Sequence, residues 1–353
     1  NASGRTAPLL YQVDNTTCSG PQPLIRLIMN AKEYAFLSGP IWVSHPKSDA
    51  QVCGTLIYQA PGVSAPEIHP QSLLGNRGNG TRTENPHNIH VSVSADNPWG
   101  KRTSVNLNTE RTHSQNMGSA LARLSGLPMP ESRAAQVRIN GQNLALPGTP
   151  QFGSYAMNET VDQAFADRQF PNDPEGNLYR GVRNLIGSSN ADLRWLGASY
   201  GAYTNAFKKE NNKTANDWSD FILLVDTLNN ATEANYTNAI DQILNANQWM
   251  RYFAFNTLTG NRETCLGTGI GDDFAMFCGL ADPRFLLLPY DVDSILGQSD
   301  GVDRATTYGD GIWRMVQSVP VVTRLIRNPA YAPLYFAQLR DLASTVFIPE
   351  RVN

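Results

Sequence analysis

Acidic residues gather around a short apolar pattern between positions 260 and 297. Asp291 and Asp293 directly follow the apolar run 285–288 and stand two positions apart. In an extended chain, residues two apart point to the same side. The two carboxylates could therefore supply oxygens to one hard cation, and this spacing predicts a site for Mg²⁺ or Mn²⁺.

Further acids precede the same pattern. Asp272 and Asp273 follow the glycine-rich stretch 267–271, and Asn261 and Glu263 end the predicted helix before it. The apolar runs 274–277 and 285–289 predict a hairpin. If that hairpin folds back on the helix, the carboxylates converge, and their repulsion favours a bound cation. An isolated Asp-x-Asp is more often a solvated turn or a helix cap, so that interpretation stays open.

The elements that must position these acids divide the chain into two predicted parts. The first third of the chain is rich in Pro, Gly, Asn and Ser, and beyond Val161 the periodicity is mainly helical, which divides the chain into residues 1–165 and 166–353. Strand patterns occur at 55–59, 89–93, 135–139 and 153–157, and helical patterns at 114–124, 218–228, 236–244, 249–258, 312–326 and 332–346. We expect an α+β fold with a sheet-rich N-terminal lobe and a helical C-terminal lobe that carries the acidic hairpin.

The charge and composition of the chain argue against nucleic-acid binding and against a membrane span. The formal net charge of -3 and the pI near 6.0 provide no basic field for nucleic acid. The sequence contains no apolar run of the length, about 18 residues, that a membrane span needs. The chain begins at Asn1 without Met, as a processed secretory protein or an excised domain does, and we expect a secreted or cell-surface location. Asn-x-Ser/Thr sequons lend weak support, at Asn1, Asn15, Asn79, Asn158, Asn212, Asn230 and Asn235.

The four cysteines lack the Cys-x-x-Cys spacing of a zinc site. Proximity along the chain favours two disulfides, Cys18 with Cys53 and Cys265 with Cys278, and buried free thiols are the alternative. Neither a Gly-x-Ser-x-Gly elbow nor a His-Glu-x-x-His motif occurs. Four tryptophans are expected in the core rather than on the surface, namely Trp195, Trp218, Trp249 and Trp313.

Taken in order, these features resemble the CotH kinase family over residues 23–297. In that family a helix ends in an Asn-x-Asp-like element, a hairpin follows, and a Pro-Trp-Asp-x-Asp-like element ends it. The corresponding segments here are Asn261-Arg262-Glu263 and Pro289-Tyr290-Asp291-Val292-Asp293. The upstream features that agree in order are Arg77-Gly78, Lys101-Arg102, the helix at 115–126, Asn140-Gly141, Glu159 and Leu178-Tyr179-Arg180.

The resemblance implies a bilobal atypical kinase-like fold that binds ATP with Mg²⁺ or Mn²⁺, with Ca²⁺ as a possible structural ion. By the same resemblance, the metal is held by Asp291, Asp293 and Asp273. The catalytic segment comprises Glu263, Asn261 and Asp272, and the nucleotide contacts are Arg77, Lys101, Arg102, Glu159 and Arg180. Within that set, Lys101 or Arg102 neutralises phosphate charge and Glu159 orients the cation by an ion pair. A solvated strand edge is the alternative for the two basic residues.

The sequence departs from the family pattern at three places. Glu263 stands where many relatives carry Asp, Arg180 replaces the usual Lys, and Asp272-Asp273 replace other polar residues. The longer side chain of Glu263 moves its carboxylate oxygens, and the guanidinium of Arg180 cannot act as an acid or base, so phosphoryl transfer could be slow even where nucleotide binds. Three functions therefore remain: a kinase acting on Ser/Thr of an extracellular protein or another hydroxyl, a pseudokinase serving as a structural or adhesion module, and a calcium-stabilised carbohydrate-binding or hydrolytic domain.

Overall fold

The computed structural model describes residues 20–78, 81–83, 85–148, 151–182, 190–269, 272–298 and 311–352. Contacts within the chain divide it into two compact units. The first comprises residues 1–116 and 132–160, and the second comprises residues 117–131 and 161–353. The helix α3 (Thr112–Leu124) begins in the first unit and continues in the second.

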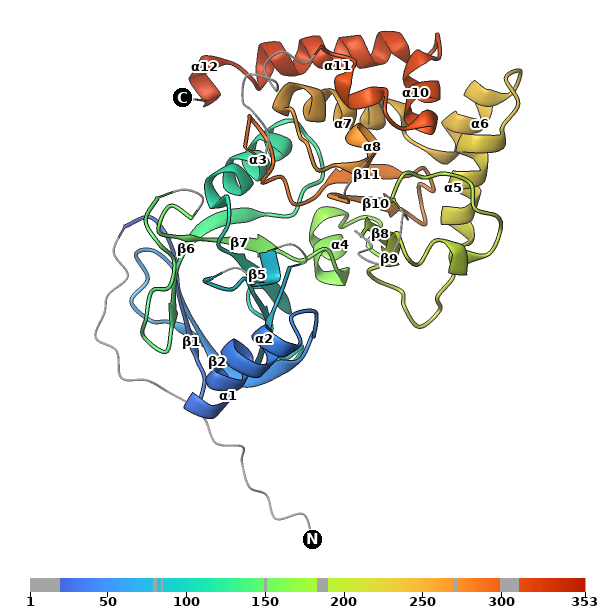
Figure 1. The fold of residues 1–353 in the computed structure, drawn as a ribbon. Helices are drawn as coiled ribbons and strands as arrows, with labels where there is room; N and C mark the ends of the chain where they lie inside the picture. Colours follow the sequence, from blue (N-terminus) through green and yellow to red (C-terminus); the bar gives the residue numbers. More distant parts are fainter. Residues whose placement is uncertain are drawn as a thin grey trace. The chain divides into compact units, whose positions relative to one another are not determined.

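The first unit is a closed β-barrel, drawn from blue to green in Figure 1. Its strands are β1 (Leu24–Ile28), β2 (Gln51–Gln59), β3 (Glu67–Asn76), β4 (Ile89–Ser92), β5 (Ser104–Asn108), β6 (Ser132–Ile139) and β7 (Tyr155–Glu159). They follow the order β1-β2-β3-β4-β5-β7-β6, and a parallel pairing of β6 with β1 closes the barrel. The short helices α1 (Ala31–Phe36) and α2 (Trp42–Ser44) follow β1.

Alternation along the strands fills this barrel. Ile89 and Val91 of β4 and Val105 and Leu107 of β5 belong to one buried apolar cluster, because every second residue of a strand faces the same side. A tight turn at Asn140-Gly141 follows β6. There the main chains of Ile139 and Gln142 exchange hydrogen bonds of 2.9 and 3.0 Å, and Asn140 and Gly141 take positive φ angles, as the sequence predicts.

The second unit combines a four-stranded sheet with helices. The sheet has the order β11-β10-β8-β9, from β8 (Asn177–Gly181), β9 (Phe207–Lys209), β10 (Phe274–Cys278) and β11 (Leu286–Pro289). The helices are α4 (Gln163–Gln169), α5 (Ser219–Asn230), α6 (Tyr236–Ile243), α7 (Ala246–Thr259), α8 (Cys265–Thr268), α10 (Pro320–Arg327), α11 (Ala332–Thr345) and α12 (Pro349–Val352). Mixed α+β architecture, with a sheet-rich N-terminal part and a helical C-terminal part, confirms the expected fold class.

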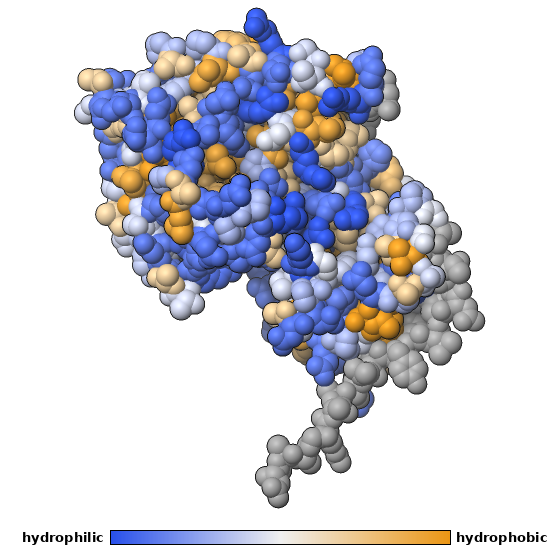
Figure 2. Space-filling view, turned by 180° about the vertical axis from the view of Figure 1, so that it is seen from behind, coloured by the Kyte–Doolittle hydropathy of each residue, from blue (hydrophilic) through white to orange (hydrophobic). Residues whose placement is uncertain are grey.

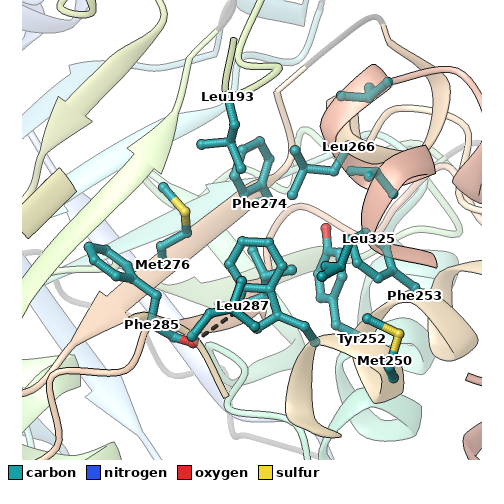
Figure 3. Close-up of a cluster of buried hydrophobic side chains, with 14 of the residues drawn as sticks. Leu193, Met250, Tyr252, Phe253, Leu266, Phe274, Met276, Phe285, Leu287 and Leu325 are labelled. Atoms are coloured by element: carbon teal, nitrogen blue, oxygen red, sulfur yellow. Dashed lines mark hydrogen bonds between the residues drawn. The ribbon is translucent and has the colours of Figure 1, made fainter. Parts of the chain in front are cut away.

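Aromatic and aliphatic side chains of the sheet and of α7 form the core of the second unit. Phe274, Met276 and Leu287 from the strands lie among Tyr252 and Phe253 from the helix (Figure 3). A hydrogen bond of 2.8 Å from the indole nitrogen of Trp249 to the carbonyl of Phe285 ties α7 to the start of β11. This packing holds the hairpin of β10 and β11 against α7.

The predicted hairpin is confirmed, since β10 and β11 pair antiparallel. The helix predicted over 312–326 is wrong at its start. Residues Arg314–Val316 form a single 3-10 turn, and α10 begins only at Pro320, because proline suits the first turn of a helix and not its interior. The core assignment of Trp313 is also wrong: this residue is 40% exposed and contacts the buried Tyr335 and the exposed Phe336.

The predicted disulfides are not borne out. Cys53, Cys265 and Cys278 are free, and Cys18 lies outside the described residues. Cys265 lies beside the start of β10, where its main-chain nitrogen approaches the carbonyl of Asp272, whereas Cys278 ends that strand. Six residues of extended chain span roughly 20 Å, far beyond the ~7 Å that a disulfide bridges between Cα atoms. Burial raises the pKa of both thiols, so they remain protonated core residues.

In the described part of the chain, no helix is long and apolar enough to cross a membrane. On the face shown in Figure 2, hydrophobic residues form small groups separated by hydrophilic ones.

Candidate active site

Three segments of the second unit bring the acidic residues together. The hairpin register pairs Phe274 with Pro289. Asp272 and Asp273 directly precede this pair, and Asp291 and Asp293 follow it, so all four lie at the open end of the hairpin. The acids before β10 and after β11 therefore meet because of strand pairing.

The third segment is the turn after α7. Thr264 forms a parallel bridge with Asp272, and the main-chain nitrogen of Arg262 donates to the carbonyl of Ser294 at 3.1 Å. Glu263 therefore lies between the segment that precedes β10 and the segment that follows β11. Gly260, with a φ of 61°, caps α7 in the left-handed conformation and turns the chain toward this position.

Asp273 lies at the centre of this cluster. Its side chain is buried, and its Oδ2 atom has no hydrogen-bond partner within the described residues. Burial raises the pKa of the Asp273 carboxyl well above its usual value, and nearby negative charges raise it further. Those charges are, in order of effect, Asp272, Asp291, Glu263 and Asp293. A buried carboxyl surrounded by like charges is costly without a proton or a cation.

The backbone at the cluster is strained. Asp273 has a φ of 32° and Asp291 a φ of 49°, in the left-handed region that non-glycine residues seldom adopt. The loop after β11 is also packed closely against α3, because a Cβ built on Gly118 would lie 2.6 Å from a methyl of Val292. Unusual backbone angles held by tight packing are a feature of functional sites.

Arg180 of β8 places a positive charge close enough to Asp272 to interact with it. It pairs with Ala275 of β10, donates from Nε to Glu210 at 2.8 Å, and lies 5.2 Å from the ring centre of Tyr290. Burial alone would lower the pKa of the Arg180 guanidinium, but Tyr290 and Glu210 outweigh it and the pKa is raised. Arg180 therefore stays charged beside the acids.

Asn261 is fully buried and uses both ends of its amide internally. Its Nδ2 donates to Asn256 at 3.0 Å, and its Oδ1 accepts from the main chain of Glu263 at 3.2 Å. In this structure Asn261 thus holds Glu263 in place.

The other predicted nucleotide contacts belong to the first unit. Lys101 is exposed in a tight turn with a φ of 71°, ahead of β5. Arg102 forms an ion pair with Glu159 at 3.6 Å, the pairing that the resemblance implies for one of the two basic residues. Arg77 donates to the Oδ1 of Asn108. Arg77 therefore lies at the end of β5, whereas Arg102 and Glu159 lie near its start, so the first unit does not gather these residues at one point.

The oxygen atoms around Asp273 determine whether a divalent cation fits this cluster. Within the described ranges, no three His, Cys, Asp or Glu side chains lie close enough together to hold one ion. The unpartnered Oδ2 of Asp273 is nonetheless an oxygen of the kind that Mg²⁺ prefers, and four more carboxylates lie near enough to shift its pKa. The chemistry of the residues fits a cation, and binding would require the half-buried acids to rotate toward Asp273.

The chain thus combines a mixed α+β fold with a group of acidic residues at the open end of a hairpin, one of which, Asp273, is buried. The sequence model described as "CotH kinase protein" matches residues 78–353. The chain therefore belongs to the CotH kinase family, and the resemblance found in the sequence is confirmed.

Two solved structures show weaker similarity. The proinflammatory kinase CtkA of Helicobacter pylori is 10% identical, with a TM-score of 0.28, covering 74% of this chain and 92% of that one. The HipA, HipB and operator DNA complex of Shewanella oneidensis MR-1 is 12% identical, with a TM-score of 0.26, covering 97% of this chain and 73% of that one. No curated protein sequence matches. Scores this low do not establish a common fold, so the family assignment rests on the sequence match.

Sequence reasoning missed several residues that shape the site. Gly118 leaves room for Val292 in the loop after β11, Glu210 forms an ion pair with Arg180, and the side chain of Asn256 accepts a hydrogen bond from Asn261. Only Gly118 left a signal, as a glycine inside a predicted helix, which usually has a packing reason.

Proposed function

We propose that the chain is a kinase-type phosphotransferase that uses ATP and a divalent cation. Family membership supports the class of reaction, and the single observation that carries the site is Asp273. Its Oδ2 atom is buried without a hydrogen-bond partner among the described residues, and burial together with four nearby carboxylates raises the pKa of this side chain. Such an arrangement is unfavourable unless a proton or a cation compensates it.

In this proposal Asp273, Asp291 and Asp293 hold Mg²⁺ or Mn²⁺. The ion would neutralise charge on the transferring phosphoryl group. Either Glu263, held by Asn261, or the half-buried Asp272 would receive the proton of the acceptor hydroxyl. Arg180, always charged, limits the repulsion among these carboxylates.

The acceptor is proposed to be a Ser or Thr hydroxyl of an extracellular or surface protein, or another hydroxyl, and the chain is proposed to be secreted. Asn230 and Asn235 are exposed and suit glycosylation in a secretory pathway that attaches glycans. Asn158, also in a sequon, is buried in β7 and does not.

A catalytically weak pseudokinase is the second candidate. It is favoured by the lack, among the described residues, of three metal-ligating side chains within reach of one ion, and by the internal use of Asn261. Such a protein would bind nucleotide without transferring phosphate and act as an extracellular structural or adhesion module.

The test combines ATP binding with transfer of a labelled γ-phosphate, each with and without Mg²⁺ or Mn²⁺. Asp273→Asn and Asp291→Asn should abolish metal-dependent ATP binding. Asp282→Asn is the matched control, because Asp282 is exposed at the opposite end of the same hairpin. Binding without transfer selects the pseudokinase, and absence of both metal-dependent binding and transfer in the wild type refutes both candidates.

A further inference from the structure

A helical stretch between β1 and β2 lies outside the part of the chain that accounts for the family assignment. It comprises α1, a π-helical turn (Leu37–Ile41) and α2, drawn in blue beside the strands of the barrel in Figure 1. Leu37 belongs to the buried apolar cluster of the barrel and attaches the stretch to it. The family model matches residues 78–353, so family membership gives these helices no role.

The outer side of this stretch is its unusual feature. Every exposed residue between Lys32 and Ser44 is apolar, namely Ala35, Phe36, Pro40 and Val43. Helix residues three and four positions apart are neighbours, so these side chains form one surface, which we call the apolar helix face. Phe36 is 47% exposed and Val43 is 72% exposed. A helix packed on a core normally has a polar outer side, and a helix that is apolar on both sides is typically covered on both.

Basic side chains stand at both ends of the apolar helix face. Lys32 lies one helical turn before Phe36, and His45 and Lys47 directly follow α2. All three basic residues are exposed. Neither lysine forms an ion pair with a residue that the structure describes, so both charges are available to a partner.

The acids of the same stretch do not cancel this charge. Between β1 and β2 the acids are Glu33 and Asp49, and Asp49 forms an ion pair with Arg82 at 2.7 Å. Two lysines therefore stand against one acid, Glu33. The surroundings of the apolar helix face are positive, although the formal net charge of the chain is -3.

The size of the face distinguishes a lipid surface from a second protein. A large aromatic side chain buries 150–250 Å², so the exposed half of Phe36 offers about 100 Å², and the four side chains together offer a few hundred Å². A stable protein interface takes about 800 Å² from each partner. A bilayer surface needs less, because a few apolar side chains enter the acyl boundary while lysines contact the phosphates of anionic headgroups.

We propose that the apolar helix face docks the protein on a lipid bilayer that contains anionic lipids. Phe36, Pro40 and Val43 enter the boundary between headgroups and acyl chains, and Lys32 and Lys47 contact the headgroups. The π-helical turn in the middle of the face agrees with such a role, because these rare turns are frequent at functional sites. The inference does not depend on the proposed phosphotransferase activity, since it uses none of the acidic residues of that site.

The experiment measures co-sedimentation of the full chain with vesicles of phosphatidylglycerol and phosphatidylcholine, and with vesicles of phosphatidylcholine alone. Phe36→Ser should bind the mixed vesicles roughly 10- to 100-fold more weakly, the range for withdrawing one large apolar side chain from an apolar environment. Phe152→Ser is the matched control, because Phe152 is 48% exposed on the same unit, and it should bind like the wild type.

The lysines are tested on the same vesicles. Lys32→Gln and Lys47→Gln should each weaken binding about fivefold, the contribution of one lysine near an anionic lipid surface. This difference should shrink at high salt, which screens the attraction. Lys208→Gln removes an exposed lysine of β9 and should have no effect.

Four results would overturn the inference: no sedimentation of the wild type with mixed vesicles, equal binding to phosphatidylcholine alone, unchanged binding of Phe36→Ser, or equal weakening by Phe152→Ser. Sedimentation velocity without lipid adds a fifth, because a wild-type dimer that Phe36→Ser converts to a monomer would show that a second copy covers the face. Melting curves of each variant show whether it is folded.

Discussion

Replacing Asp273 by Asn should stabilise the metal-free protein near pH 7. Asparagine has nearly the same shape but no charge, and its NH₂ group can donate to the surrounding acids. The aspartate leaves a buried oxygen without a partner among the described residues, and four carboxylates raise its pKa. An unpaired buried polar atom costs about 1–3 kcal/mol, and more when it is charged, so we expect a gain of at least this size.

The sign of the pH dependence follows from the raised pKa of Asp273. The folded protein holds this proton more tightly than the unfolded chain, in which the pKa is near the ordinary value of 3.8. The stability that the proton contributes is complete below that value and is lost as the pH rises through the folded pKa. The advantage of Asp273→Asn should therefore be small at pH 3 to 4 and grow toward neutral pH.

Urea unfolding of both proteins at several pH values, with and without Mg²⁺, measures these effects. At a Mg²⁺ concentration one hundred times the dissociation constant, the wild type should gain about 2.7 kcal/mol and the variant nothing. Asp282→Asn is again the control and should show neither effect. The reasoning is refuted if Asp273→Asn destabilises the protein at pH 7 while Mg²⁺ stabilises both proteins equally.

Three further predictions concern the elements that support the site. Gly118→Val places a branched side chain against Val292, where a Cβ alone would already lie at 2.6 Å from a methyl group. The variant should lose about 1–3 kcal/mol in the free energy of unfolding and bind ATP with metal more weakly. Unchanged binding would show that α3 does not hold the loop after β11. Trp249→Ala should cost about 3–5 kcal/mol in denaturant unfolding, because it removes a buried indole and its bond to Phe285; a loss under 1 kcal/mol would contradict this packing. Asp173→Ala should speed amide exchange at Leu280 and its two successors, whose main-chain nitrogens lie 2.9–3.3 Å from that carboxylate, while leaving ATP binding intact.

The local elements of this protein could be predicted from sequence because they depend on short-range patterns. Alternation marked β2 and β4, and 3.6-residue periodicity marked α5, α7 and α11. The hairpin of β10 and β11 followed from two apolar runs with a turn between them. The start of α10 was missed because an apolar pattern continued across Val319 and Pro320, where proline sets the helix boundary.

The sequence by itself determined that acids flank a hairpin and that this order of segments belongs to the CotH kinase family. Tertiary structure decided which acid is buried. Asp272 and Asp273 are adjacent in the chain, yet Asp272 is half-buried and Asp273 is buried. Asp273 lies between the bridge of Asp272 to Thr264 and the paired strands β10 and β11, and these contacts remove its side chain from water. Desolvation depends on neighbours distant in the chain, as does the distance that rules out a Cys265–Cys278 disulfide, and no local pattern encodes either.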